Sequence, residues 1–406
     1  MTALHSYVAS ATATPEAVDA LVAQIRPEEA PELVFVFYGC GHDDALLHRR
    51  LRARFPSAGL IGGTSSGGVL SERGASGPDA IGLLCLSDPE GDYGVAAGPL
   101  GEDAAAAAEA LLHEAIRVAG APGELPELVW VYQVPGREEH VLRGLRRVVG
   151  DRCPIIGGSS ADEDVSGRWR QFGPQGPLVD GLVVAVLLPS SPIGFAFQGG
   201  YEPAGPSGIV TGIGFRPAGI SGVVTATTGR EIVSIDGEPA ALVYNRWTEG
   251  CITAQLDGGT VLAETTMFPL ATLAGQADGV SQFLLMHPES VTPQGALRTF
   301  CDLQAGARVY AMRGDRQRLV ERACKVVEQA RAALPDPDER PAGVLLVYCG
   351  GCKLAVGPQI GDVARTVAQS LGAVPFLSCF TFGEQGHLIE RNGHGNLMIS
   401  AIVFAR

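Results

Sequence analysis

The sequence predicts a mixed α/β protein built from repeated strand–helix–strand–strand units that form mixed sheets, with a Gly-rich α+β segment inserted between the second and third units. Three observations predict this fold. Short apolar runs rich in β-branched and aromatic residues alternate with amphipathic helical stretches. This alternation occurs three times along the 406 residues. The chain also holds 54 glycines, clustered at the ends of the apolar runs, where tight turns are expected.

Each unit opens with a buried strand that leads into a helix. The opening runs are LVFVFY at 33–38, LVWVYQ at 128–133 and VLLVYC at 344–349. Leucine, isoleucine and valine recur at helical spacing in the stretches that follow, 43–55, 137–149 and 359–371. A crossover of this kind places the first and second strands of a unit parallel to each other.

A second short strand in each unit then enters a loop of small residues, and a third apolar strand closes the unit. The second strands and loops lie at 60–66, 155–160 and 376–381, and the third strands at 80–86, 182–188 and 397–404. Between the second and third units, residues 193–334 form the inserted segment. It opens with Gly-rich short strands, including GFRP at 214–217, and contains an Asp236-Gly237 turn, a short helix at 239–247 and a longer helix at 321–334.

Composition excludes several classes of function. The formal net charge is −14, from 30 basic and 44 acidic residues, so we expect neither nucleic acid nor an anionic membrane as a partner. No apolar run is long enough to span a bilayer, and the N-terminus lacks the pattern of a signal peptide. Nine cysteines spread over the chain, without the density of a disulfide scaffold, indicate reduced thiols and a cytoplasmic protein.

The order of motifs resembles the FIST family. Its N-terminal region is indicated by GGTSSG at 62–67, IGGSSAD at 156–162 and WRQF at 169–172. Its C-terminal region is indicated by RPAG at 216–219, GREIVSIDG at 229–237, PAALVY at 239–244, FP at 268–269, YC at 348–349 and FGEQ at 382–385. One position departs from the family pattern, since Gly67-Gly68 stands where relatives often carry Gly-Glu.

The resemblance implies a domain organisation and a function. It divides the chain into a helical lead-in at 1–29, a FIST N-terminal domain at 30–190 with two units, and a FIST C-terminal domain at 191–406, whose third unit is 342–406. It also implies an intracellular sensory or signal-transduction protein, not an enzyme, that binds an amino-acid-like ligand without a cofactor. Because the chain shows no kinase, receiver or DNA-binding segment, we expect the signal to pass to a separate partner protein such as a kinase or cyclase.

The ligand site is expected beyond the carboxyl ends of the parallel strands, where loops meet helix N-termini. Hydroxyl and backbone N–H groups there can hold a small charged group. The candidate residues in the three small-residue loops are Thr64, Ser65, Ser159, Ser160 and Thr381. An ordinary turn or helix cap is the alternative role for each of them.

Cys349-Gly-Gly-Cys352 is the strongest candidate for a chemically active motif. It follows a predicted strand and precedes a helical stretch, a position where the partial positive charge of a helix start lowers the pKa of a thiol. The spacing of the two cysteines suits a redox pair or half of a zinc site, so a thiol-dependent enzyme is one candidate function. The alternative is that the two thiols pack in the core without a chemical role. No second C-x-x-C or H-x-x-x-H motif completes a zinc site, so no metal is predicted. The family resemblance makes Cys349 a pocket residue, and Cys379 is expected to face the same cavity.

Three further residues remain candidates near the C-terminus. Glu384 follows Phe382-Gly383, where the family keeps Gly-Glu, and its carboxylate can bind a ligand amine; a salt bridge to Arg391 is the alternative. Some FIST proteins resemble haem-binding nitric-oxide sensors, which makes His387 and His394 candidate axial ligands. A solvent-exposed hairpin is the alternative explanation for both histidines.

Overall fold

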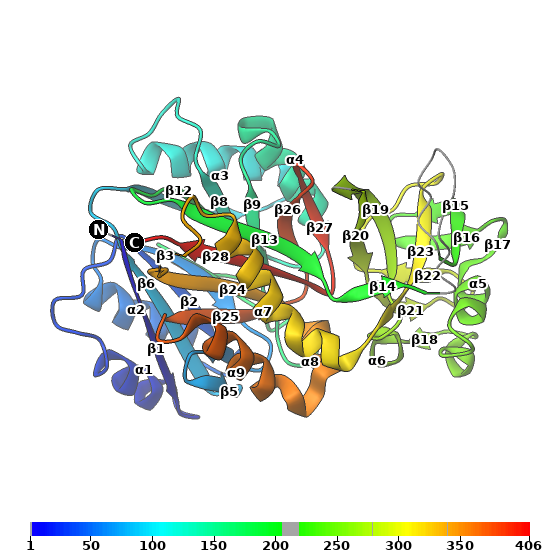
Figure 1. The fold of residues 1–406 in the computed structure, drawn as a ribbon, viewed down its shortest axis with the longest axis horizontal. Helices are drawn as coiled ribbons and strands as arrows, with labels where there is room; N and C mark the ends of the chain where they lie inside the picture. The colour runs from blue at the N-terminus through cyan, green and yellow to red at the C-terminus, as the bar shows by residue number, and fades with distance from the viewer. Residues whose placement is uncertain (1, 205–218, 278, 339) are drawn as a thin grey trace.

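The structure is a computed structural model that describes residues 2–204, 219–277, 279–338 and 340–406. These residues form three six-stranded sheets and one ten-stranded sheet. In Figure 1 the six-stranded sheets occupy the left and centre of the molecule, and the ten-stranded sheet lies at its right-hand end. The mixed α/β class predicted from the sequence is confirmed.

The first sheet has the strand order β1-β6-β2-β3-β10-β11. Its strands are β1 (Ala3–Ser10), β2 (Leu33–Tyr38), β3 (Gly59–Thr64), β6 (Ala80–Ser87), β10 (Gln171–Gly173) and β11 (Gly176–Leu178). Strands β2 and β3 are parallel and joined by helix α2 (Asp44–Arg54), as expected for a crossover unit. The segment 1–29 contributes the edge strand β1 as well as helix α1 (Thr14–Val22), whereas we expected helix alone.

The second sheet has the order β27-β26-β9-β8-β12-β7. Its strands are β7 (Asp92–Pro99), β8 (Leu128–Gln133), β9 (Ile155–Ser159), β12 (Gly181–Leu188), β26 (Glu384–Leu388) and β27 (Arg391–Gly395). Helices α3 (Ala104–Val118) and α4 (Glu138–Val149) pack on it through a shared apolar cluster. Asp103 caps α3 by accepting hydrogen bonds from the N–H groups of Ala105 and Ala106.

The third sheet has the order β13-β28-β24-β25-β4-β5. Its strands are β4 (Val69–Ser71), β5 (Gly74–Ser76), β13 (Ile193–Gly199), β24 (Gly343–Cys349), β25 (Phe376–Thr381) and β28 (Met398–Phe404). Helix α7 (Arg316–Ala332) packs on this sheet, and its Asp315 cap places its start five residues earlier than the predicted 321. Helices α8 (Gly350–Val356) and α9 (Ile360–Leu371) follow β24.

Each six-stranded sheet is completed by a hairpin from a distant part of the chain. The β4–β5 hairpin follows β3 in sequence but pairs with β25; β10–β11 follows β9 but pairs with β3; β26–β27 follows β25 but pairs with β9. This pairing corrects one sequence-based expectation. Gly62 and Gly63 lie within strand β3, not in a loop, because Phe172 and Gln171 of β10 pair with them.

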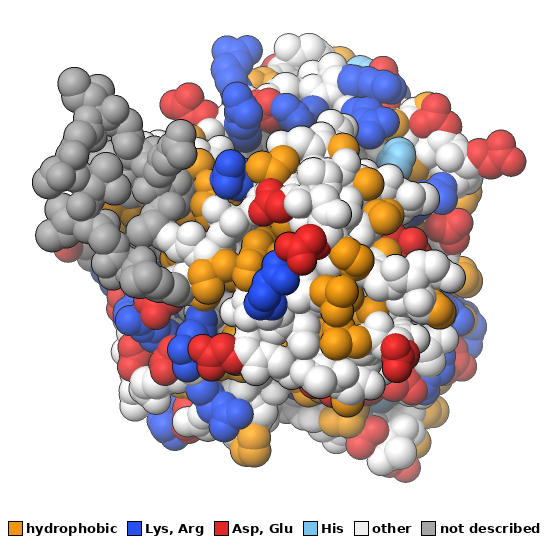
Figure 2. All heavy atoms as spheres, turned by 90° about the vertical axis from the view of Figure 1, so that its right-hand side faces the viewer, with side chains coloured by type: hydrophobic (Ala, Val, Ile, Leu, Met, Phe, Trp, Pro, Cys, Tyr) orange, Lys and Arg blue, Asp and Glu red, His pale blue; other side chains and the backbone are white. Residues whose placement is uncertain are grey.

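The ten-stranded sheet forms most of the inserted segment. Its strands are β14 (Tyr201–Pro203), β15 (Ser221–Thr228), β16 (Glu231–Ile235), β17 (Glu238–Pro239), β18 (Gly259–Thr260), β19 (Leu270–Ala277), β20 (Val280–Met286), β21 (Pro288–Val291), β22 (Leu297–Thr299) and β23 (Arg308–Gly314). Helices α5 (Ala240–Trp247) and α6 (Leu262–Thr265) belong to the same segment. The strand expected at 214–217 lies outside the described residues. Figure 2 looks onto this end of the molecule, where apolar side chains lie among acidic and basic ones.

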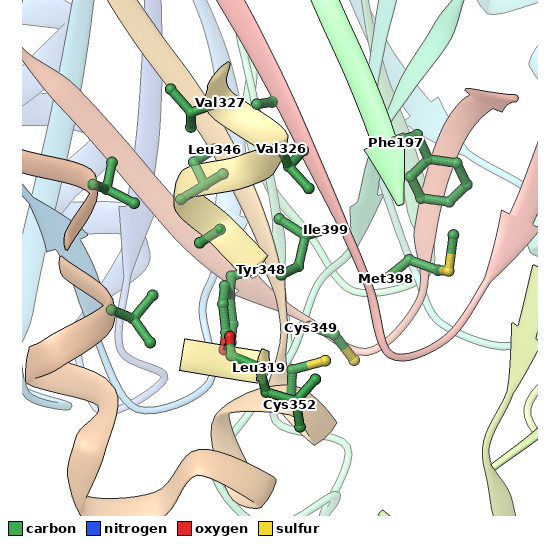
Figure 3. Close-up of a cluster of buried hydrophobic side chains, with 14 of the residues drawn as sticks. Phe197, Leu319, Val326, Val327, Leu346, Tyr348, Cys349, Cys352, Met398 and Ile399 are labelled. Carbon is green, nitrogen blue, oxygen red and sulfur yellow. Dashed lines mark hydrogen bonds between the residues drawn. The ribbon is translucent and has the colours of Figure 1, made fainter. Parts of the chain in front are cut away.

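Buried apolar side chains hold the sheets together in clusters. One cluster joins the facing sides of all three six-stranded sheets, with Phe35 and Trp130 in edge-to-face contact at 5.6 Å between ring centroids. Another packs α7, α8 and α9 against the third sheet; Figure 3 shows part of it, with Tyr348, Cys349 and Cys352 near Leu319. Within the part of the chain that the structure describes, no helix combines the length and apolar character needed to cross a bilayer.

Candidate functional site

A cavity of about 360 Å³ lies where segments from all three sheets meet. The loop after β3 contributes Ser66 and Gly67, and the loop after β9 contributes Glu163 and Val165. The N-terminal end of α8 supplies a third wall, and the inserted segment supplies a fourth. The cavity therefore lies at the ends of the parallel strand pairs, where the topology predicts a ligand.

Lys353 is the cavity's basic side chain. From α8, its ammonium group donates hydrogen bonds to the carbonyl oxygens of Ser66 and Gly67, at 2.6 and 2.7 Å, and lies 4.3 Å from the ring centroid of Phe380. Burial lowers the pKa of Lys353 to about 8, although the nearby Glu163 carboxylate opposes that shift. Two of the three ammonium N–H groups are thus used within the protein, and one remains for a ligand.

Glu163 places a carboxylate on the same cavity. Its Oε1 accepts a hydrogen bond from the N–H of Gly67 at 3.4 Å, and its Oε2 accepts one from the thiol of Cys40. Because Lys353 bonds to the carbonyl of that same Gly67, the cation and the carboxylate are held by a single turn of the chain. The cavity wall thus carries opposite charges close together.

Cys349 and His287 form the inner wall. Cys349 is the N-cap of α8, and its sulfur accepts hydrogen bonds from the N–H groups of Gly351 and Leu397, at 3.3 and 3.1 Å. The helix begins directly after Cys349, whereas the sequence predicted a start near residue 359. A Cβ atom added to Gly351 would lie 3.5 Å from Cys349 Sγ, 3.3 Å from His287 Nδ1 and 2.5 Å from Leu397 Cδ2, so the thiol and the imidazole lie near each other beside a leucine methyl group.

Burial keeps both side chains neutral. It raises the pKa of Cys349 well above the usual value for a thiol, and it lowers the pKa of His287 to about 4. His287 Nε2 donates to the carbonyl oxygen of Leu262 at 3.1 Å, so Nδ1 carries the lone pair. The inner wall therefore offers a neutral thiol and a neutral imidazole acceptor, without a net charge.

Four of the predicted hydroxyl residues make contacts between segments, away from the cavity lining. Ser65 Oγ accepts from the N–H of Phe380 at 2.8 Å, and Thr64 Oγ1 accepts from the N–H of Arg170 at 3.0 Å. Ser160 Oγ accepts from Gln171 Nε2 at 2.6 Å and donates to Gln133 O at 3.1 Å. Ser159 Oγ donates to Glu138 Oε1 at 2.6 Å. All four side chains are buried, and these bonds tie each strand end to a neighbouring strand, hairpin or helix.

Three more predicted residues lie behind the cavity wall. Thr381 donates to Glu384 Oε1 at 2.7 Å, while Glu384 Oε2 accepts from the N–H of Met398 at 3.1 Å. Burial raises the pKa of Glu384 well above its usual range. Cys379 packs in the cluster between the sheets, apart from the cluster that holds Cys349. Of the predicted ligand residues, Cys349 lies on the described cavity.

The two candidate haem ligands lie on the β26–β27 hairpin. His387 Nε2 donates to the carbonyl oxygen of Asp151 at 2.9 Å, and its ring packs edge-on against Phe195. His394 is buried, and its Nδ1 lies 2.9 Å from Glu139 Oε1. Burial lowers the pKa of His394, but Cys301, Glu139 and Glu138 outweigh that effect and raise it well above its usual range. Neither histidine is among the residues that line the cavity.

A second cavity of about 340 Å³ adjoins the first and shares Val165, Phe300 and Phe382 with it. Its lining includes Glu138 and Arg230. Val165 stands between the two cavities with a φ of 57°, a left-handed conformation that costs a β-branched residue strain energy.

Sequence reasoning missed several cavity residues. Glu163 belongs to an acidic run, 162–164, that has the pattern of a solvated loop, and Lys353 lies one residue beyond the C-x-x-C motif without a signal of its own. His287, Phe300 and Asn396 reach the cavity only through tertiary packing, and no local sequence pattern points to them.

The fold and the cavity define an α/β protein with a small, internally charged site between its sheets. The FIST N domain matches residues 32–213 and the FIST C domain matches residues 240–387. Together these matches span most of the sequence, and the chain belongs to the FIST family. FIST domains are sensory or signal-transduction domains.

Comparison with curated proteins found no match. Among solved structures, cyanuric acid hydrolase from A. caulinodans is similar at 10% identity and a TM-score of 0.34, over 100% of both chains. A chorismatase is similar at 11% identity and a TM-score of 0.34, over 99% of this chain and 98% of the other. At these scores neither likeness carries an argument about fold or activity.

Proposed function

We propose that this protein is a sensor that binds a small amino-acid-like ligand in the cavity of about 360 Å³ and passes the signal to a separate partner protein. The observation that carries the proposal is the pairing of Lys353 with Glu163 on one cavity wall, beside the aromatic rings of Phe300 and Phe382. A zwitterion presents the complementary pair of charges. The mostly apolar remainder of the wall suits a hydrophobic side chain.

In this arrangement the ligand carboxylate accepts a hydrogen bond from the free N–H of Lys353. The ligand ammonium group donates a hydrogen bond to the carboxylate of Glu163. The side chain of the ligand packs against Phe300 and Phe382. Because the cavity wall comes from loops after β3 and β9 and from α8, a bound ligand contacts all three six-stranded sheets at once. Its binding energy therefore stabilises one relative arrangement of those segments.

A separate protein is needed to receive the signal that ligand binding produces, and we propose a kinase or cyclase for this role. Leu354 and Val165, at the cavity, keep 53% and 42% of their surface exposed, which gives a partner apolar contacts that report on ligand binding. The nine cysteines, all free, fit a reducing compartment such as the cytoplasm. The equivalent strand orders of the three six-stranded sheets support the proposal that they are copies of one module.

Thermal unfolding against a panel of L-amino acids tests the proposal. A ligand that binds only the folded state at 100 times its Kd adds about 2.7 kcal/mol to the free energy of unfolding. We expect one or more amino acids to raise the Tm of the wild type, and Lys353→Met and Glu163→Gln each to abolish that shift. Lys325→Met, on the exposed face of α7, is the matched control and keeps it. A panel without any shift, or a shift that survives both cavity variants, contradicts the proposal.

A thiol-dependent enzyme is the second candidate, favoured by the nearness of Cys349 Sγ and His287 Nδ1. Cys349 would act as nucleophile and His287 as base, with Cys352 buried beneath them. The raised pKa of Cys349 disfavours the thiolate that such chemistry needs, so binding has the stronger support. Loss of a thiol-dependent turnover in Cys349→Ser, with ligand binding retained, would favour the enzyme.

The haem alternative has less support from the described residues. His387 and His394 bond to Asp151 and Glu139, and neither borders the two cavities described above. A Soret band that appears when haem is added, and that disappears in His387→Ala or His394→Ala, would favour haem binding over the amino-acid ligand.

A further inference from the structure

Three side chains with metal-binding donor atoms converge beside the second cavity. Glu139 comes from the first turn of α4, Cys301 from the segment after β22, and His394 from β27. One ligand atom of each lies within 4.8 Å of the ligand atoms of the other two. Cys301 lies 162 positions after Glu139 and 93 positions before His394, so only the tertiary structure brings the three side chains together.

Neighbouring groups hold the cluster in place. Arg230 Nη2 donates to Glu139 Oε2 at 2.6 Å and to Glu138 Oε2 at 2.8 Å, which leaves Glu139 Oε1 facing His394. The N–H of Asp302 donates to Glu139 Oε1 at 3.0 Å. The thiol of Cys301 donates to Asn396 Oδ1 at 3.0 Å. The three donor side chains therefore sit in fixed positions before any ion arrives.

The imidazole of His394 faces the cluster through Nδ1, which lies 2.9 Å from Glu139 Oε1. Its other nitrogen, Nε2, lies toward Gly383 and has no hydrogen-bond partner among the described residues. The His394 side chain keeps only 1% of its surface exposed, so the imidazole is shielded from solvent. Glu138, Glu139 and Asp302 bring three carboxylates to the guanidinium of Arg230, and His394 adds a second basic group beside Glu139. A divalent cation that displaces two protons from the cluster leaves this balance of charge unchanged.

We propose that Glu139, Cys301 and His394 bind a zinc ion, with a water molecule at the fourth position. Carboxylate, thiolate and imidazole together match the ligand preferences of zinc, and three protein ligands with one open position form a common zinc arrangement. The ion replaces the proton between Glu139 and His394 and the proton of the Cys301 thiol. This site fastens the inserted segment to the second sheet and to helix α4, which packs on that sheet. It does not rest on the ligand proposed for the first cavity.

Cobalt substitution tests the site, because a thiolate bound to Co²⁺ gives a charge-transfer absorption band that oxygen and nitrogen ligands do not. The full-length protein, stripped with a chelator, is titrated with Co²⁺ and then with Zn²⁺. We expect one Co²⁺ per chain, a thiolate band, its loss when Zn²⁺ displaces Co²⁺, and a higher Tm with Zn²⁺ than without. The variants Cys301→Ser and His394→Asn should lose the band, and Cys324→Ser, a half-exposed cysteine on α7, should keep it.

Circular dichroism of the metal-free variants shows whether they fold. If either variant fails to fold, the wild type decides the question by itself, through the stoichiometry, the thiolate band and the rise in Tm. A wild type that gives no thiolate band overturns the proposal. A band that persists in folded Cys301→Ser, or that disappears in Cys324→Ser, also overturns it, because the thiolate ligand would then be another cysteine.

Discussion

The ammonium group of Lys353 donates a hydrogen bond to the carbonyl oxygen of Ser66 at 2.6 Å, across 287 positions of sequence. This bond joins helix α8 of the third sheet to the loop after β3 of the first. The site proposed for ligand binding is therefore also a junction between distant segments, and its residues affect both binding and stability.

Gly67→Ala is expected to abolish the ligand-induced rise in Tm. Gly67 has a φ of 67°, and a Cβ there would collide with Lys353 Nζ, so the ammonium group must leave its carbonyl partners. The left-handed conformation alone costs about 1–2 kcal/mol in a residue with a side chain. Gly74→Ala is the matched control, since its φ is 115° and no atom lies within 4 Å of the added Cβ. Both variants should lose stability, and only Gly67→Ala should lose the ligand response.

Lys353 is expected to make stability rise with pH. Burial lowers its pKa in the folded protein to about 8, below the usual value of 10.5 for a lysine. Below pH 8 the amine is charged in both the folded and the unfolded protein, so folding carries the full free-energy cost of burying the charge. Between pH 8 and 10.5 the amine is neutral in the folded protein and still charged in the unfolded one, so that cost decreases as the pH rises. The wild type should gain on the order of 2 kcal/mol relative to Lys353→Met between pH 7 and 10. Urea denaturation at four pH values measures the difference, and parallel profiles would contradict the assignment.

Ser65 and Ser66 are expected to respond differently to the same substitution. Ser65→Ala removes the acceptor of the Phe380 N–H and the donor to the Gly68 carbonyl, both buried, and should cost about 2 kcal/mol. Ser66 lines the cavity, and Ser66→Ala should change stability by less than about 0.5 kcal/mol. Equal Tm values for the two variants would show that the Ser65 bonds do not stabilise the junction.

Glu384→Gln is expected to stabilise the protein more at pH 7 than at pH 4.5. The folded-state pKa of Glu384 is raised, so the unfolded carboxyl group loses its proton at a lower pH than the folded one, and stability falls as the pH rises through that range. Glutamine has no such dependence and should gain about 1 kcal/mol or more relative to wild type over that interval. Glu384→Ala leaves the Thr381 hydroxyl and the Met398 N–H without an acceptor and should destabilise at both pH values. A pH-independent effect of Glu384→Gln would show that the pKa of Glu384 is not raised in the folded protein.

The strands and helices of the six-stranded sheets could be predicted because their burial follows local patterns. Strand β2, LVFVFY, is buried at every residue, and its sequence is a continuous apolar run. Such runs are typical of strands whose sheet is covered on both faces. The helix expected at 137–149 is α4, whose Val141, Leu142 and Leu145 form its buried face. Periodicity alone was sufficient for these elements.

The contacts of the hairpins could not be predicted, because pairing with a remote strand leaves no local trace. Ser65 has the sequence context of a loop hydroxyl, yet its partner is the N–H of Phe380 in β25. His287 reaches the cavity from the inserted segment, whose contact with α8 depends on the whole fold. The sequence therefore indicated the strand ends as the region of the site, but most of the residues that line it were found only in the structure.

The crossed hairpins decide how the protein can be dissected. A fragment that stops near residue 190 lacks β26–β27, so β9 becomes an unprotected edge, and its own β4–β5 hairpin has no strand to join. Open edges of this kind recruit other chains and promote aggregation. The two FIST regions are consequently halves of one folding unit, and neither half expressed by itself retains its complete sheets.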